Sequence, residues 1–180
     1  YKEQVLIGIK EGVDLVLIET ISDLYEAKAA ILAAKENSDL PVICTMTFEE
    51  DGKTFIGTSA KNCAITLSSL KVDALGANCS LGPKELMPIV NDLVSYSKVP
   101  VIIQANAGLP REEDGSTVYD ITIEEYTNEI KKMVDKGVRI FGGCCGTTPE
   151  FIKSIRKYLD TTQPKEPNYI NHSCATSATK

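Results

Sequence analysis

Short apolar runs rich in β-branched residues alternate along this chain with amphipathic helical stretches, and this alternation limits the possible folds more than any other feature. Parallel strands joined by crossover helices have this pattern. We expect five strands, at residues 13–18, 41–47, 74–78, 100–105 and 138–142. With 180 residues, 43% of them hydrophobic, the chain is long enough to bury one sizeable core. The sequence therefore predicts an α/β fold.

The helices between these strands have recognisable start and stop residues. Asp23 and Thr122 are each followed by a glutamate three residues later, which is the spacing of N-terminal capping residues. Gly137 is expected to end the second of these helices. Pro83 and Pro149 each suit the first turn of a helix that follows a strand directly.

The predicted strands carry their polar or sulfur-containing residues at the carboxyl ends, namely Glu19, Met46, Cys79, Asn106 and Cys144. In a (β/α)8 TIM barrel these ends converge at one mouth, where catalytic groups gather, and an open doubly wound sheet brings them together less well. A complete barrel usually needs about 250 residues. We therefore expect a partial barrel of about the last five βα units, with the first units outside this chain or with the sheet closed in another way.

Three cysteines follow two of these strands: Cys79, and the adjacent pair Cys144 and Cys145. Three thiolates can bind one Zn²⁺ and leave its fourth position open to water or to a thiol substrate, which the metal would deprotonate. Gly143 and Gly146 beside the pair indicate a sharp bend or a closely approaching ligand. In the alternative interpretation the pair are small buried residues on a tight turn. A disulfide between adjacent residues has unfavourable geometry.

The remaining cysteines and the single histidine are not expected to bind metal. Cys44 and Cys63 lie outside the glycine-rich motifs and are predicted to be core residues. Cys174 and His172 lie in the polar tail. The irregular spacing of the cysteines favours thiol or metal chemistry over a disulfide framework.

Charge and hydropathy exclude two classes of partner. The net charge is −6, with acidic and basic residues dispersed, so the basic stripe that nucleic acid requires is absent. No apolar stretch approaches the roughly 20 residues of a membrane span, and no signal peptide is recognisable. We expect a cytoplasmic protein with one domain at residues 1–160. Residues 161–180 are polar and contain proline, and are predicted to be a linker to a further module of a longer protein.

Three motifs together resemble the zinc-dependent homocysteine S-methyltransferase family. They are Gly-Ala-Asn-Cys-Ser-Leu-Gly-Pro at 76–83, Asn-Ala-Gly-Leu-Pro at 106–110 and Gly-Gly-Cys-Cys-Gly-Thr-Thr-Pro at 142–149. Their order and spacing also match, and the likeness extends over about residues 5–160. Within the family, the chain is most similar to the homocysteine-binding modules of cobalamin-dependent methionine synthases. The family's three amino-terminal βα units have no counterpart in this sequence.

The resemblance implies a TIM barrel that binds Zn²⁺ through Cys79, Cys144 and Cys145. Homocysteine would be the fourth ligand, and its thiolate would attack a methyl donor to give methionine. Methylcobalamin on another module is the expected donor, with betaine or S-methylmethionine as the alternatives. Two further readings are a non-catalytic zinc-binding module that docks a corrinoid-carrying partner, and a redox protein that uses Cys144 and Cys145.

Two further site residues match family positions. Asn106 matches a position near the metal, and its side chain is expected to fill the open coordination site before substrate arrives; its alternative role is that of a turn residue. Glu19 matches the acidic residue that binds the amino group of the substrate, which requires a charge-assisted partner. The alternative for Glu19 is a charge favoured by the dipole of the following helix.

Overall fold

The computed structural model describes residues 1–163, 165–171, 173 and 175–177. Five strands form a parallel sheet in the order β1-β2-β3-β4-β7, and two short antiparallel strands form a hairpin. Cys174 and His172 lie outside the described residues. The strands are β1 (Val16–Ile21), β2 (Val42–Met46), β3 (Ala74–Asn78), β4 (Val101–Ala105), β5 (Arg111–Glu113), β6 (Ser116–Val118) and β7 (Ile140–Gly143).

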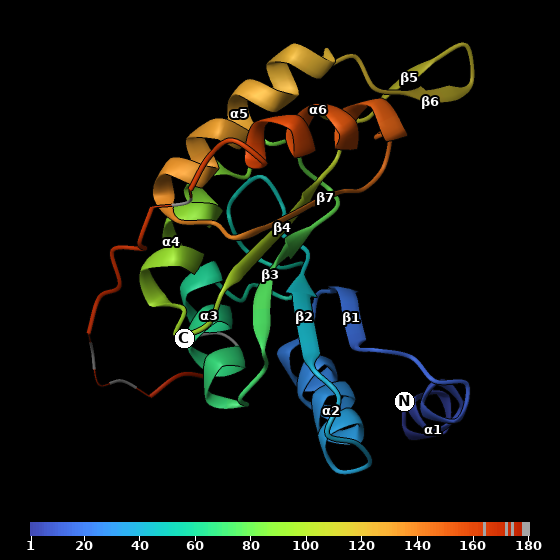
Figure 1. Cartoon of the computed structure of the whole chain (residues 1–180), viewed down its shortest axis with the longest axis vertical. Helices are drawn as coiled ribbons and strands as arrows, with labels where there is room; N and C mark the ends of the chain where they lie inside the picture. Colours follow the sequence, from blue (N-terminus) through green and yellow to red (C-terminus); the bar gives the residue numbers. More distant parts are fainter. Residues whose placement is uncertain (164, 172, 174, 178–180) are drawn as a thin grey trace.

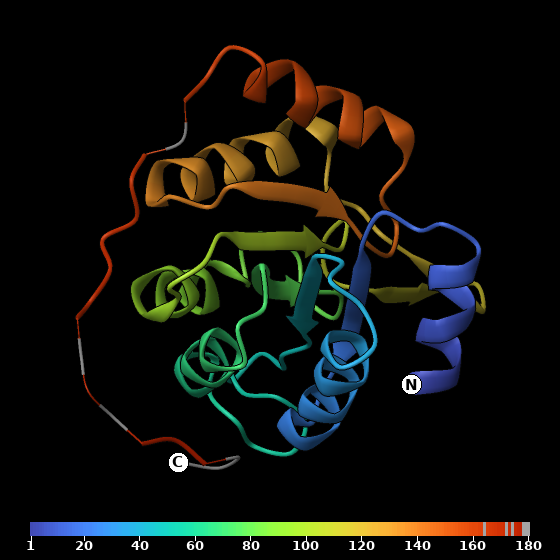
Figure 2. The ribbon, with the colours of Figure 1, turned by 60° about the horizontal axis from the view of Figure 1, so that its bottom comes forward.

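Six helices accompany these strands in the described residues, and in Figure 2 the parallel strands form an arc with α2 to α6 along its outer side. Buried aliphatic residues fill the space between this side of the sheet and the helices. The α/β class predicted from the alternation is confirmed. The helices are α1 (Lys2–Lys10), α2 (Leu24–Lys35), α3 (Ala60–Ser69), α4 (Met87–Tyr96), α5 (Ile123–Lys136) and α6 (Pro149–Leu159).

The sheet is open in the part of the chain that the structure describes, because β1 and β7 each pair with one neighbour only (Figure 1). Leu15 and Leu17, beside and within edge strand β1, are partly exposed although they are large apolar residues. An edge strand with exposed apolar side chains is a surface on which further strands can pair. A closed barrel is not formed by these residues alone.

Several helix boundaries follow the predicted signals. Asp23 caps α2 by accepting a hydrogen bond from the Tyr25 main-chain N–H at 2.8 Å, and Thr122 forms a complete capping box with Glu125. Gly137 ends α5 in the left-handed conformation, with φ of 103°. These interactions are local in sequence, which is why the sequence reveals them.

Three local predictions need correction. The first strand begins at Val16, three residues later than predicted, because its pairing with β2 starts opposite Val42. Glu19 therefore lies within β1, at a shift in register between Ile18 and Ile21, and does not follow the strand. Pro83 lies in a turn, and the helix after it begins only at Met87.

The helix α1 and the β5–β6 hairpin were not expected from the sequence. The hairpin projects from the sheet in Figure 1. Its turn at Asp114 and Gly115 has φ of 51° and 75°, the left-handed pair that short hairpins require. The stretch from Arg111 is exposed and pairs with residues 116–118, and neither strand has the hydrophobic alternation by which a sequence predicts a strand.

Cys44 and Cys63 are fully buried, as predicted for core residues. Burial raises the pKa of each thiol from 9.0 to about 12, because the apolar core disfavours the charged thiolate. The folded chain therefore holds these two protons more tightly than the unfolded chain does. Their contribution to stability is complete below pH 9 and is lost as the pH rises toward 12.

We predict that alkaline pH lowers the free energy of unfolding, and that Cys63→Ala reduces this dependence. At about pH 10, each buried thiol should lower the free energy of unfolding by about 1.4 kcal/mol relative to its value at neutral pH. Urea unfolding at about pH 8 and pH 10 measures the change in both proteins, and the loss should be smaller in the variant by about that amount. An equal loss in both would show that Cys63 does not titrate differently in the folded and unfolded chains.

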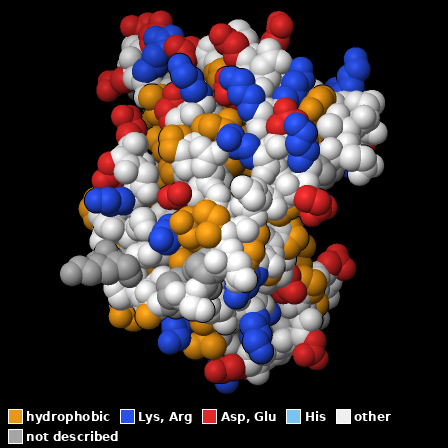
Figure 3. Space-filling model, turned by 90° about the vertical axis from the view of Figure 1, so that its left-hand side faces the viewer, with side chains coloured by type: hydrophobic (Ala, Val, Ile, Leu, Met, Phe, Trp, Pro, Cys, Tyr) orange, Lys and Arg blue, Asp and Glu red, His pale blue; other side chains and the backbone are white. Residues whose placement is uncertain are grey.

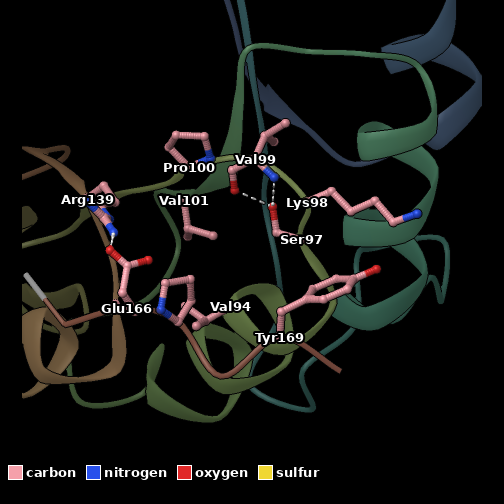
Figure 4. A pocket seen from close by; sticks show the side chains of 11 residues that line it. Val94, Ser97, Lys98, Val99, Pro100, Val101, Arg139, Glu166 and Tyr169 are labelled. Atoms are coloured by element: carbon pink, nitrogen blue, oxygen red, sulfur yellow. Dashed lines mark hydrogen bonds and ion pairs between the residues drawn. The ribbon is translucent and has the colours of Figure 1, made fainter. Parts of the chain in front are cut away.

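The described part of the tail has no helix or strand and crosses the ends of α4 and α5. Arg139 binds Glu166 at 2.7 Å, and the Ile170 main-chain N–H donates to the Ser95 carbonyl at 2.8 Å. Between tail and sheet lies a cavity of about 430 Å³, which Figure 4 shows with Tyr169 at its edge. The tail thus packs on the domain, while its role as a linker stays a prediction.

The surface carries both signs of charge. On the face drawn in Figure 3, acidic and basic side chains are interspersed with small apolar areas. None of the helices in the described ranges combines the length and apolar character needed to cross a bilayer.

Candidate metal centre

The sheet order brings the three predicted cysteines together. Cys79 directly follows β3 and Cys144 directly follows β7, and these two strands lie on either side of β4. Since the strands are parallel, both cysteines are at the same end of the sheet. The Sγ atoms of Cys79 and Cys145 are 3.5 Å apart, those of Cys144 and Cys145 are 4.0 Å apart, and all three lie within 4.8 Å of one another.

These separations fit a single metal ion. Three sulfurs at about 2.3 Å from a tetrahedral Zn²⁺ are about 3.8 Å from one another. Cys79 and Cys144 are partly buried while Cys145 is exposed, so the cluster has an open side. Soft thiolate donors select Zn²⁺ over hard cations such as Mg²⁺. The metal-binding role of these residues stays a prediction that the thiol geometry supports.

Main-chain hydrogen bonds fix the turn that carries the cysteine pair. The Cys144 N–H donates to the Ala105 carbonyl at 2.9 Å, and the Cys145 carbonyl accepts from the Ala107 N–H at 2.9 Å. The Thr147 hydroxyl donates to the Cys144 carbonyl at 2.7 Å. The end of β4 therefore holds the turn in place from one side, and Thr147 holds it from within.

The surroundings of Cys144 favour the protonated form of its thiol. The pKa of Cys144 is raised to about 12, mainly by burial and also by a hydrogen bond with the neighbouring Cys79 and by the charge of Cys79. Several thiolates so close together repel one another unless a cation lies between them. A divalent cation would reverse this preference, and its binding would release protons.

Asn106 directly follows β4 and is 2% exposed. Its Oδ1 accepts a hydrogen bond from the Cys145 main-chain N–H at 3.1 Å. The structure thus brings Asn106 to the cysteine cluster and gives it a role in holding the turn. Its predicted role as a temporary metal ligand stays a prediction.

Glu19 is exposed, and none of the hydrogen bonds or ion pairs among the described residues joins it to the three cysteines. It lines a cavity of about 420 Å³ between α1 and β1. Its neighbour Thr20 is hydrogen-bonded to Asn78, the residue before Cys79. Its predicted binding of the substrate's amino group stays a prediction.

Tyr119 is a site residue that the sequence did not indicate. It follows the β5–β6 hairpin, and its ring lies so close to Gly146 that a Cβ built there would be 2.4 Å from Cγ of the ring. Burial raises the pKa of Tyr119, and Cys145 raises it further through its charge and a hydrogen bond. Gly146 signalled a close approach, but only the fold identifies the approaching group.

Asn78 is a second residue that was missed, although it lies within the motif around Cys79. It is buried and hydrogen-bonded to Thr20, Thr45 and Thr47. The sequence shows that Asn78 lies next to a predicted metal ligand. The sequence does not show which residues of the two other strands hydrogen-bond to it.

Comparisons with known proteins identify the family of this chain. The sequence profile of the homocysteine S-methyltransferase family matches residues 1–159. The chain is 29% identical over 188 aligned positions to methionine synthase of Mycobacterium leprae, covering 99% of this chain and 16% of that protein. It is 30% identical over 161 positions to methionine synthase of Mycobacterium tuberculosis, covering 86% of this chain and 14% of that protein. The chain therefore spans about a sixth of these relatives.

The fold is similar to that of homocysteine methyltransferase MmuM from Escherichia coli. The metallated form aligns with a TM-score of 0.69 and 21% identity over 86% of this chain and 48% of MmuM. The apo form aligns with a TM-score of 0.65 over 83% of this chain and 51% of MmuM. The profile match covers most of the chain, and the sheet with its helices has the corresponding architecture. This chain belongs to the homocysteine S-methyltransferase family.

Proposed function

We propose that this chain is the homocysteine-activating part of an enzyme that methylates homocysteine to methionine. The observation that carries the proposal is the convergence of the Cys79, Cys144 and Cys145 thiols within 4.8 Å at the carboxyl end of the sheet. Family membership supports the substrate and the reaction class. The thiol spacing supports Zn²⁺ as the cofactor.

We further propose that the five parallel strands are the last part of a (β/α)8 barrel. Both edges of the sheet, β1 and β7, lack a second neighbour in the described chain, and apolar residues beside β1 are exposed. The match to about half of the MmuM chain supports the same interpretation. Additional strands would cover these edges and complete the mouth in which the cysteines lie.

The residues of the site would divide the work between thiol activation and substrate orientation. When bound, Zn²⁺ supplies a positive charge that lowers the pKa of a thiol at its open position. Asn106 holds the main chain of Cys145, so the three thiols keep their spacing. Glu19 would bind the ammonium group of homocysteine by a charge-assisted hydrogen bond. The substrate thiolate then forms a bond to the methyl carbon as the donor's bond to that carbon breaks.

Methylcobalamin on a separate module is the methyl donor that we propose. The chain covers only 16% and 14% of the methionine synthases to which it is similar, so such relatives have ample length for another module. Residues 161–180 would be the linker toward it. Betaine and S-methylmethionine are the alternative donors. The thiols require a reducing compartment, for which we propose the cytoplasm.

The test is homocysteine binding by the full chain loaded with Zn²⁺. Titration in weak buffer at neutral pH should release about one proton per homocysteine, because the bound thiol ionises, whereas free thiols of pKa about 8.5 remain protonated. Methionine, which has no thiol, is the matched control and should release none. Stoichiometric zinc without homocysteine binding would refute the proposal and support the docking module instead.

A further inference from the structure

A hydrogen-bond network centred on one buried residue joins the carboxyl ends of β1, β2 and β3. Its centre is Asn78, the last residue of β3, which is 1% exposed. The Asn78 Oδ1 accepts from the Thr20 main-chain N–H at 2.8 Å and from the Thr45 hydroxyl at 2.6 Å. Its Nδ2 donates to the Thr20 hydroxyl at 2.7 Å, and its main-chain carbonyl accepts from the Thr47 hydroxyl at 3.1 Å. One residue thus connects three neighbouring strands.

Thr20 requires the support of this network. Its φ of 62° lies in the left-handed region, which β-branched residues rarely adopt. Such a conformation persists only where the surrounding contacts enforce it. Two of the Asn78 hydrogen bonds end on Thr20, at the point where the register of β1 shifts between Ile18 and Ile21. Asn78 therefore holds the bulge in its observed conformation.

The network lies between the two proposed contacts of the substrate. Glu19 immediately precedes Thr20, and Cys79 immediately follows Asn78. Cys79 also has a positive φ, of 64°. The hydrogen bonds between Thr20 and Asn78 thus fix the main chain next to Glu19 and next to Cys79.

Building on the proposed function, we propose that Asn78 is a positioning residue that fixes the distance from the Glu19 carboxylate to the Cys79 thiol. A substrate with an ammonium group and a thiol must span this distance to bind both ends. Asn78 acts through Thr20 and does not touch the substrate. The network thereby selects amino thiols of the length of homocysteine over thiols without an amino group.

The test compares two ligands on the zinc-loaded full chain by calorimetry: homocysteine and 4-mercaptobutyrate, which lacks the amino group. The wild type should bind homocysteine about tenfold or more tightly, as expected for a hydrogen bond between charged groups. Thr20→Val keeps the β-branched shape that disfavours positive φ but removes the hydroxyl that accepts from Asn78, so the affinity ratio should fall close to one. Thr20→Gly adopts positive φ freely and should keep most of the ratio. Thr20 is exposed, and circular dichroism should show that both variants are folded.

A rescue experiment tests the role of Asn78 itself. Asn78→Ala should reduce the affinity ratio, and adding Thr20→Gly should restore part of it, which general loosening of the core would not do. Thr127→Val, which removes a buried hydroxyl between α5 and α6, is the matched control and should keep the wild-type ratio.

Each remaining outcome has a distinct meaning. An unchanged ratio in Thr20→Val, or an equal loss of affinity for both ligands, would overturn the positioning role. Equal binding of both ligands by the wild type would overturn this inference alone, because the thiol would still be activated. If the wild type with a full complement of zinc binds neither thiol, the proposed function fails and this inference fails with it.

Discussion

Replacing Cys79 by alanine is expected to lower the zinc content of the purified chain from about one ion to almost none. Cys79 supplies one of three thiols, and its Sγ lies 3.5 Å from that of Cys145. Loss of a residue that hydrogen-bonds to a metal ligand typically lowers the metal affinity about 10- to 100-fold. Loss of a ligand itself should therefore weaken zinc binding by more than about 100-fold. Metal analysis after dialysis against a weak chelator measures the difference.

The matched control for this variant is Cys63→Ala. Cys63 is fully buried in α3 and belongs to the core, so its loss removes a thiol without touching the cluster. Circular dichroism should show folded protein for both variants. Full zinc content in Cys79→Ala would contradict a three-cysteine site, and loss of zinc in Cys63→Ala would show that metal binding depends on the core in general.

Replacing Gly146 by alanine should distort the turn that carries the cysteine pair. Gly146 has φ of 78°, and an added Cβ would lie 2.4 Å from Cγ and 2.5 Å from Cδ2 of Tyr119. The φ alone costs about 1 kcal/mol, and the collision forces Tyr119 or the cysteine turn to move, for a total of about 3 kcal/mol. Because the turn carries Cys144 and Cys145, zinc affinity should fall together with the free energy of unfolding.

Gly115→Ala separates the two causes. Gly115 has φ of 75°, but an added Cβ would have no heavy atom within 4 Å. This variant should lose only the roughly 1 kcal/mol due to φ, and should bind zinc normally. Combining Gly146→Ala with Tyr119→Ala should recover part of the zinc affinity. Equal effects of the two single glycine variants would show that Tyr119 does not press on the turn.

The local elements of the fold could be read from the sequence because short-range interactions determine them. The capping box at Thr122 and the stop at Gly137 depend on residues within one helix turn, and both are confirmed. The strand Ala74–Asn78 has the predicted bounds because all five of its residues are buried and only the last, Asn78, has a polar side chain. The first strand was misplaced because its start depends on pairing with Val42, which is distant in sequence.

The candidate site was predictable in its cysteines but not in their surroundings. Cys79 and Cys144 belong to recognisable motifs at strand ends, and parallel strands place such residues on one edge. Tyr119 and the partners of Asn78 come from other segments. Nothing in the local pattern specifies which side chain approaches Gly146.

The sequence by itself determined the α/β class, the helix ends and the three cysteines at strand ends, since these follow from periodicity, capping chemistry and motif spacing. Only the tertiary structure decided that β3, β4 and β7 are neighbours, and hence that the three thiols lie within 4.8 Å. Only the tertiary structure revealed the bulge at Thr20 and the hydrogen bond that joins Thr20 to Asn78. Strand order and buried side-chain partners depend on contacts between distant segments, and such contacts leave no local pattern in the chain.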